Sequence, residues 1–154
     1  LIKQNKRVSV FGGRDIQSNI YQDTIEIGER LADEGYIVFC GGGKGVMEAI
    51  SIGVENRNGI VVGLLKGGDT SEGNAHLTVP VATGIGIARN ALLAYNCDAV
   101  IAISGEYGTL SEIAYAFQLE KTVIGYNTWD ISPIIMANTP VDVIDKLKEE
   151  LEHV

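Results

Sequence analysis

Residues 38–50 read VFCGGGKGVMEAI, in which an apolar run breaks into glycines and then resumes. Four glycines fall within five positions, at 41, 42, 43 and 45. Glycine weakens the interior of a strand or a helix, so such a cluster is expected between two elements. The stretch therefore predicts a β-strand over Tyr36–Cys40, a glycine-rich turn, and a helix over Val46–Asn56.

Outward from this stretch, short apolar runs alternate with helical patterns. Further strands are predicted over Arg7–Phe11, Ile60–Leu65, Leu77–Val81, Ala99–Ile103, Thr122–Tyr126 and within 132–138. Further helices are predicted over Ser18–Glu34, Ile87–Tyr95, Thr109–Leu119 and from Thr139-Pro140 onward, where Thr suits the N-cap and Pro the first helical position. Because the strands are apolar throughout, we expect a three-layer α/β fold. The prediction is a Rossmann-like, doubly wound parallel sheet of about six or seven strands, in one domain over residues 1–154.

Composition excludes several classes of function. The 154-residue chain carries a net charge of −8 and no run of Lys and Arg, so we expect no nucleic acid polymer as a partner. No apolar run approaches the roughly 18 residues of a membrane span, so we expect no membrane partner either. Cys40 and Cys97 are expected to be buried thiols in a reducing cytoplasm. With His76 and His153 as the two histidines, a metal site has no support.

Glycines recur where the predicted strands end, which is the edge of a parallel sheet where ligands bind. Their amides can approach a ligand closely, and a helix N-terminus adds partial positive charge. We therefore expect a phosphate-bearing ligand there, although each cluster taken alone could simply make a tight turn. The glycines assigned to ligand binding are Gly12, Gly13, Gly41, Gly42, Gly43, Gly45, Gly105 and Gly108.

Two familiar phosphate-binding motifs do not fit. Lys44 is followed by Gly45 rather than by the Ser or Thr of a Walker A loop. The first turn, FGGRD at 11–15, is not GxGxxG, and the second strand ends in Cys40-Gly41 where an acid should hold the ribose hydroxyls. An NAD-dependent redox enzyme is therefore disfavoured.

Three further stretches carry a family resemblance: GGDTSE at 67–72, PVATGIGIARN at 80–90 and GTLSEIA at 108–114. Together with GGGKGVM at 41–47, they resemble the LOG family, a Rossmann-like group once mislabelled lysine decarboxylases. The similarity runs from about Val8 to Tyr126 and is strongest to a short branch that includes the molybdenum cofactor carrier proteins. Characterised LOG proteins are phosphoribohydrolases that split the N-glycosidic bond of a nucleoside 5′-monophosphate.

The resemblance implies roles for particular residues. Gly108 and Thr109 would hold a phosphate, and Arg89 and Glu112 would match the catalytic arginine and glutamate of the family. A carboxylate suits that reaction, because cleavage of the bond builds oxocarbenium character on the ribose. The chain departs from the hydrolases in three places, one of which is its opening glycine motif, which is one residue shorter. The chain also has SGEYGT at 104–109 where they read PGGxGT, and it has Asn90 where they have a lysine.

Plainer interpretations stay open for the same residues. Thr109-Leu110-Ser111-Glu112 fits a helix capping box, in which Glu112 would bond back to the backbone of Thr109. Arg89 could form a surface ion pair. Lys44 and Arg14 could be solvated loop cations. Tyr107 could stack on a base or lie at a subunit contact, and Trp129 is expected to pack against a neighbouring element.

Two functional hypotheses follow. In the first, the protein binds a phosphorylated, nucleotide-like or pterin-like small molecule, with a nucleoside monophosphate or the molybdenum cofactor as candidate ligands and no cofactor required. In the second, it is a phosphoribohydrolase acting on a nucleoside 5′-monophosphate. The resemblance also implies a homodimer or a larger homo-oligomer, which the weakly charged helical segment AYAFQL at 114–119 would suit.

Overall fold

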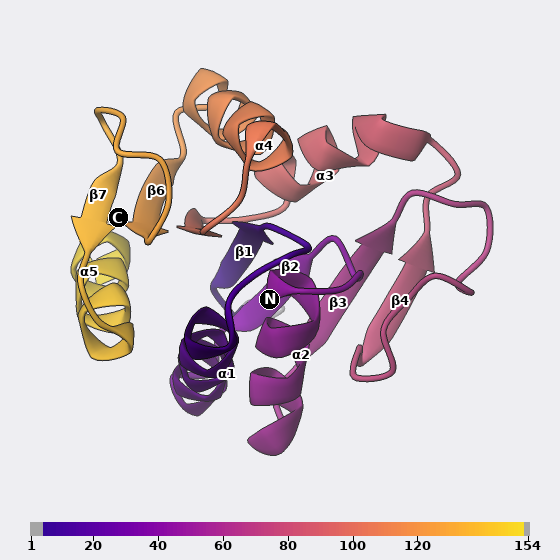
Figure 1. Cartoon of the computed structure of the whole chain (residues 1–154), viewed down its shortest axis with the longest axis horizontal. Helices are drawn as coiled ribbons and strands as arrows, with labels where there is room; N and C mark the ends of the chain where they lie inside the picture. The colour runs from indigo at the N-terminus through magenta and orange to yellow at the C-terminus, as the bar shows by residue number, and fades with distance from the viewer. Residues whose placement is uncertain (1–4, 153–154) are drawn as a thin grey trace, which may run out of the picture.

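The computed structural model describes residues 5–152; the ends of the predicted domain, His153 among them, lie outside the described residues. Within that range the chain forms one parallel sheet of seven strands in the order β4-β3-β2-β1-β5-β6-β7 (Figure 1). The predicted Rossmann-like α/β fold is confirmed. The strands are β1 (Arg7–Gly12), β2 (Ile37–Cys40), β3 (Val61–Leu65), β4 (Val79–Ala82), β5 (Ala99–Ile103), β6 (Thr122–Tyr126) and β7 (Ile135–Ala137).

Helices cover both faces of the sheet. In Figure 1, α1 (Ser18–Asp33), α2 (Val46–Asn56) and α5 (Pro140–Glu152) lie on one face. The opposite face carries α3 (Arg89–Tyr95), which follows the 3-10 turn η1 (Gly86–Ala88), and α4 (Tyr107–Gln118). None of the helices among residues 5–152 has the length and apolar character needed to cross a membrane.

Two apolar cores lie on either side of the sheet, and β1 contributes to both. Val8 and Val10 point into the core beneath α1, α2 and α5. Phe11 points into the core beneath α3 and α4. Every residue of β5 is buried, as a central strand of a sheet covered on both faces requires.

The structure corrects one local prediction. Helix α4 begins at Tyr107 with Glu106 at the N-cap, so Thr109 already lies inside the first turn. The capping box predicted for Thr109 and Glu112 is therefore wrong, because Thr109 is not the N-cap. The predicted cap of α5 is confirmed, since Thr139 Oγ1 accepts a hydrogen bond of 3.0 Å from the Asp142 amide.

The sheet order creates a topological switch point. From β1 the chain continues to β2, β3 and β4 on one side, and β5 then returns to pair with β1 on the other side. The segments that follow β1 and β5 therefore depart to opposite faces of the sheet. In an open α/β sheet this divergence leaves a crevice at the carboxyl ends of the two strands, where ligands bind.

Close contact between α1 and α2 supports one side of this crevice. A Cβ atom added at Gly28 would lie 2.6 Å from the Ile50 carbonyl oxygen. A Cβ atom added at Gly53 would overlap the Ile25 carbonyl oxygen and lie 2.9 Å from Gly28 Cα. The two glycines therefore allow the helix backbones to touch, and no larger side chain fits between them.

We expect Gly53→Ala to lower the free energy of unfolding by about 1–3 kcal/mol, because the added methyl group must push the helices apart. Urea denaturation measures the change. Gly68→Ala is the matched control, since a Cβ atom at Gly68 meets nothing within 4 Å. Equal urea midpoints for the two variants would show that the helices are not in close contact.

Candidate functional site

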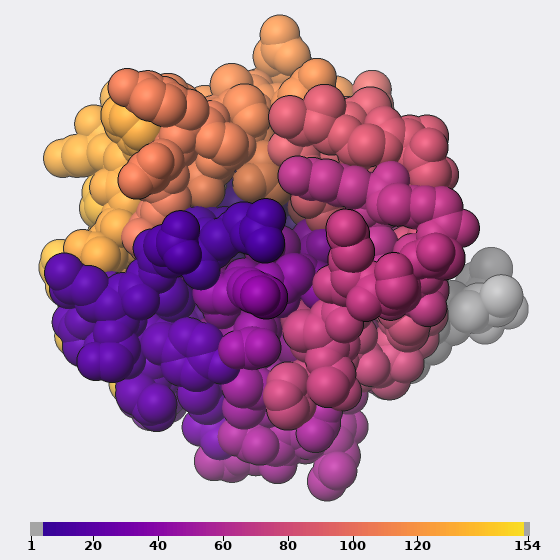
Figure 2. Space-filling model, turned by 45° about the vertical axis from the view of Figure 1, so that its right-hand side comes forward, coloured from indigo at the N-terminus to yellow at the C-terminus, as the bar shows by residue number. Residues whose placement is uncertain are grey.

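A cavity of about 480 Å³ lies at the switch point. Its walls are the segments that follow β1, β2, β3 and β5, together with the starts of α3 and α4. Figure 2 views this rim of the molecule, where indigo, magenta and orange segments border a hollow. Of the residues predicted from the sequence, those in the cavity wall are Gly12, Gly13, Gly41, Arg89, Gly105, Gly108, Thr109 and Glu112.

The other three predicted glycines shape the loop behind the wall. The carbonyl oxygens of Gly42 and Gly43 accept hydrogen bonds of 3.2 and 3.0 Å from Asn74 Nδ2. Gly45 is the N-cap of α2 with a φ of 67°, a conformation that favours glycine. A Cβ atom there would overlap the Gly13 carbonyl oxygen. For these positions a turn and a close backbone contact are sufficient reasons for glycine.

The N-terminus of α4 opens into the cavity. No side chain caps this helix, so its first amides have no side-chain partner. Gly105, at a φ of 91°, brings the chain against the buried Thr109 so closely that a Cβ atom would overlap the threonine side chain. At Gly108, by contrast, an added Cβ atom would meet nothing within 4 Å. The arrangement leaves polarised amides and open space, which is what an anion site needs.

Arg89 is a buried clamp rather than a surface residue. Only 6% of the surface of Arg89 is exposed. Its Nη1 donates hydrogen bonds to the carbonyl oxygens of Gly41, at 2.7 Å, and of Leu64, at 2.5 Å. Nε donates to Asn90 Oδ1 at 2.9 Å. Among the described residues, none of the ion pairs within 4.0 Å includes Arg89. The surface ion pair is therefore wrong: Arg89 holds together the ends of β2 and β3.

Glu112 lies in the second turn of α4 and is half-buried in the cavity wall. Burial raises the pKa of its carboxyl from 4.5 to about 7, and the nearby charges of Arg89 and Lys66 oppose that rise. Among residues 5–152, no group donates a hydrogen bond to this carboxyl. Its carboxyl is thus poised between the neutral and charged forms near neutral pH.

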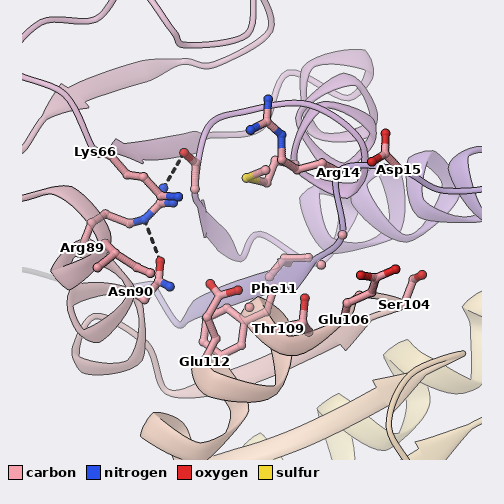
Figure 3. Close-up of a pocket in the computed structure, with 18 residues that line it drawn as sticks. Phe11, Arg14, Asp15, Lys66, Arg89, Asn90, Ser104, Glu106, Thr109 and Glu112 are labelled. Atoms are coloured by element: carbon pink, nitrogen blue, oxygen red, sulfur yellow. Dashed lines mark hydrogen bonds between the residues drawn. The ribbon is translucent and has the colours of Figure 1, made fainter.

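The charged groups around the cavity balance one another. Arg14, Lys66, Asp15 and Glu106 all lie in the wall, with Arg14 and Asp15 next to each other and Lys66 on the other side of the view in Figure 3. From the sequence, Arg14 is expected to be a solvated loop cation, and Lys66 has no predicted role. The sequence signal for Lys66 is its position directly after β3, at the edge of the sheet where the strands end and ligands bind. Lys44 is exposed and outside the cavity wall, which fits a solvated cation.

Two aromatic residues lie beside the entrance to α4. Tyr107 is 79% exposed, and its ring centroid lies 6.0 Å from that of Trp129. Trp129 Nε1 also donates to the Glu106 carbonyl oxygen at 3.1 Å. The predicted packing of Trp129 on a neighbouring element is confirmed, and its indole fixes the N-cap of α4.

The two cysteines lie outside the cavity wall. Cys40 and Cys97 are free and buried, and burial raises the pKa of both thiols. Residues 5–152 contain no group of three or more His, Cys, Asp and Glu side chains arranged to hold a metal ion.

The sequence profile of the SLOG cluster4 family matches residues 5–151. The chain belongs to the SLOG cluster4 family. A probable cytokinin riboside 5′-monophosphate phosphoribohydrolase of rice, LOGL5, is 33% identical over 113 residues, which cover 70% of this chain and 46% of the rice protein. The chain thus matches about half the length of that relative. The predicted resemblance to LOG proteins is confirmed.

Two solved structures of other proteins have the same fold. The molybdenum cofactor binding protein of Rippkaea orientalis superposes with a TM-score of 0.91 at 27% identity, over 96% of this chain and 98% of that one. The molybdenum cofactor carrier protein of Chlamydomonas reinhardtii gives a TM-score of 0.89 at 25% identity, over 97% and 99% of the two chains. This SLOG protein is thus similar over nearly its whole length to a molybdenum cofactor binding protein and a carrier protein, and over most of it to a probable phosphoribohydrolase.

Titration of Glu112 generates a prediction for stability. The folded pKa of about 7 lies above the ordinary 4.5, so between these values the native protein keeps a proton that the unfolded chain has lost. The stability of the wild-type protein therefore falls as pH rises through this window. Glu112→Gln is neutral throughout, so its Tm should rise relative to wild type by a few degrees between pH 5 and pH 8.

Differential scanning fluorimetry at several pH values measures this difference. Glu72→Gln, at an exposed glutamate, is the matched control and should follow the wild-type pH profile. A constant Tm difference between Glu112→Gln and wild type from pH 5 to pH 8 would show that the native carboxyl titrates normally.

Proposed function

We propose that this SLOG protein binds a phosphorylated, nucleotide-like or pterin-like small molecule, with the molybdenum cofactor as one candidate ligand. The observation that carries the proposal is the uncapped N-terminus of α4, which opens beside Gly105 and Gly108 into the cavity at the switch point. The site suits a phosphate because helix amides, glycine backbone and a partial positive charge converge there.

The size and charge of the cavity support the same ligand class. About 480 Å³ lies within the range of small-molecule sites, so a phosphate can be held together with the ring system attached to it. Lys66 and Arg14 supply positive charge, and Asp15 and Glu106 offset it. The cavity therefore has no large surplus of positive charge, and recognition depends on backbone amides and on the state of Glu112.

The similar carriers support the proposal from a second direction. The R. orientalis and C. reinhardtii proteins, whose folds match nearly the whole of this chain, are described as molybdenum cofactor binding and carrier proteins. That cofactor is a phosphorylated pterin, and so belongs to the ligand class for which the cavity is suited.

Native mass spectrometry tests the proposal. The protein as purified should carry a phosphate-containing adduct, and added AMP should bind. Lys66→Ala should weaken AMP binding about tenfold, because a hydrogen bond between charged groups is lost. Lys44→Ala removes the same charge outside the cavity and should bind as wild type. The proposal is contradicted if the purified protein carries no adduct and does not bind AMP, GMP or the molybdenum cofactor.

The same spectra report the oligomeric state, for which we propose a homodimer or a larger homo-oligomer. Ile87 is 73% exposed, and Tyr95 and Tyr115 are exposed on the helices of the same face. Apolar side chains on one helical layer would suit an interface between two copies of the chain. A spectrum with monomers alone at micromolar concentration would count against this part of the proposal.

A second candidate function, phosphoribohydrolase activity, is favoured by Glu112. A half-buried carboxyl with a pKa of about 7 can stabilise the oxocarbenium-like ribose as a carboxylate, or donate a proton to the departing base as an acid. In this reaction water adds to C1′, the N-glycosidic bond breaks, and the base leaves with the proton. The products are ribose 5-phosphate and the free base.

Incubation with AMP and with cytokinin ribotides distinguishes the two functions. If the protein is a hydrolase, chromatography should detect free base, and Glu112→Gln should reduce its release at least about a hundredfold, since general acid–base residues contribute that much. Glu72→Gln should leave the rate unchanged. Stable binding of AMP without release of adenine supports the carrier-like function instead.

A further inference from the structure

Asn90 is the second residue of α3 and lies in the cavity wall beside Arg89. Asn90 is only 7% exposed, so its side-chain amide is almost enclosed by protein. A buried amide carries one acceptor oxygen and a nitrogen with two donor hydrogens, each of which needs a partner. Only the side-chain oxygen of Asn90 has a hydrogen-bond partner among the described residues.

The orientation of this amide is determined by its neighbour. Arg89 Nε can only donate, and it lies 2.9 Å from the Asn90 oxygen, so the oxygen must face Arg89. Arg89 cannot turn away, because its Nη1 is held by the carbonyl oxygens of Gly41 and Leu64. The Asn90 nitrogen must therefore point away from the arginine.

That nitrogen has no protein acceptor. No hydrogen bond from Nδ2 to another described residue is present, whereas every fully enclosed side-chain nitrogen or oxygen in residues 5–152 has a partner. An unpartnered Nδ2 must therefore be in contact with open space, and the open space beside Asn90 is the cavity. Two donor hydrogens thus face the cavity in a fixed direction.

Glu112 supplies the complementary group. Figure 3 draws the Asn90 amide between the Arg89 guanidinium and the Glu112 carboxyl. The phosphate proposed at Gly108 and Thr109 would lie at the first turn of α4, whereas Glu112 is in the second turn. A phosphate placed at Asn90 would be next to a carboxyl group, so the uncharged part of the ligand is the better partner there.

We propose that Asn90 is a specificity-determining residue, whose side-chain amide donates to a hydroxyl oxygen or ring acceptor on the uncharged part of a phosphorylated ligand. This inference rests on the proposed binding function and assigns the wall formed by Asn90 and Glu112 to the sugar-like or heterocyclic part. A neutral donor beside a carboxyl group selects a ligand group that both accepts and donates, and it penalises an apolar one whose binding would leave the amide unpaired.

Isothermal titration calorimetry with AMP and with inorganic phosphate tests the inference. Asn90→Asp keeps the acceptor for Arg89 Nε but removes both Nδ2 hydrogens. Its added charge should weaken both probes, and loss of the donor should weaken AMP about tenfold more than phosphate. Asn90→Leu removes the donor without adding charge and should likewise weaken AMP more than phosphate. Thermal unfolding of each variant verifies that it is folded.

The outcomes separate the inference from the function on which it rests. If Asn90 merely anchors Arg89, Asn90→Asp will weaken AMP and phosphate by the same factor, which overturns the inference while binding stands. If the wild-type protein binds neither probe, the proposed function fails, and the inference fails with it.

Discussion

The pairing of β1 with β5 is the constraint on which the rest of the structure depends. The two strands run in register from Val8 opposite Ala99 to Gly12 opposite Ile103. Their following segments then separate to opposite faces of the sheet. The separation begins at a close contact, because a Cβ atom at Gly13 would lie 3.1 Å from Gly105 Cα. The cavity exists because two adjacent strands end together and their continuations diverge.

Arg89 links this crevice to the other half of the sheet. By donating to the ends of β2 and β3, it holds a permanent positive charge in the wall, and no acidic side chain among residues 5–152 forms an ion pair with it. Burial lowers the pKa of this guanidinium, and the charge of Glu112 raises it. The two groups therefore influence each other across the cavity, and Glu112 can respond to a ligand by gaining or losing a proton.

Carrier and hydrolase functions would use the same cavity and differ in what its wall does to the ligand. The uncapped end of α4 would serve either function, because both need a place for phosphate. Asn90 and Glu106 are two of the positions where this chain departs from the hydrolase pattern, and both lie in the wall. Asn90 contributes a neutral donor and Glu106 a carboxylate, so a ligand bound there would be surrounded by fewer positive charges than the pattern of the hydrolases supplies.

The sequence by itself determined the order of strands and helices, the parallel sheet and the edge on which the glycines lie. The spacing of apolar residues and the glycines between elements are local features of the sequence, so they can be recognised without the structure. The edge follows as well, because the carboxyl ends of parallel strands lie at the same edge of a sheet. The tertiary structure decided which glycines line the cavity, why Gly45 serves a turn instead, and where α4 begins. It also decided that Arg89 is buried, that Lys66 and Asn90 line the cavity, and that the pKa of Glu112 is raised. These properties arise from contacts between segments far apart in the chain, and burial and electrostatics depend on all the neighbours that folding assembles.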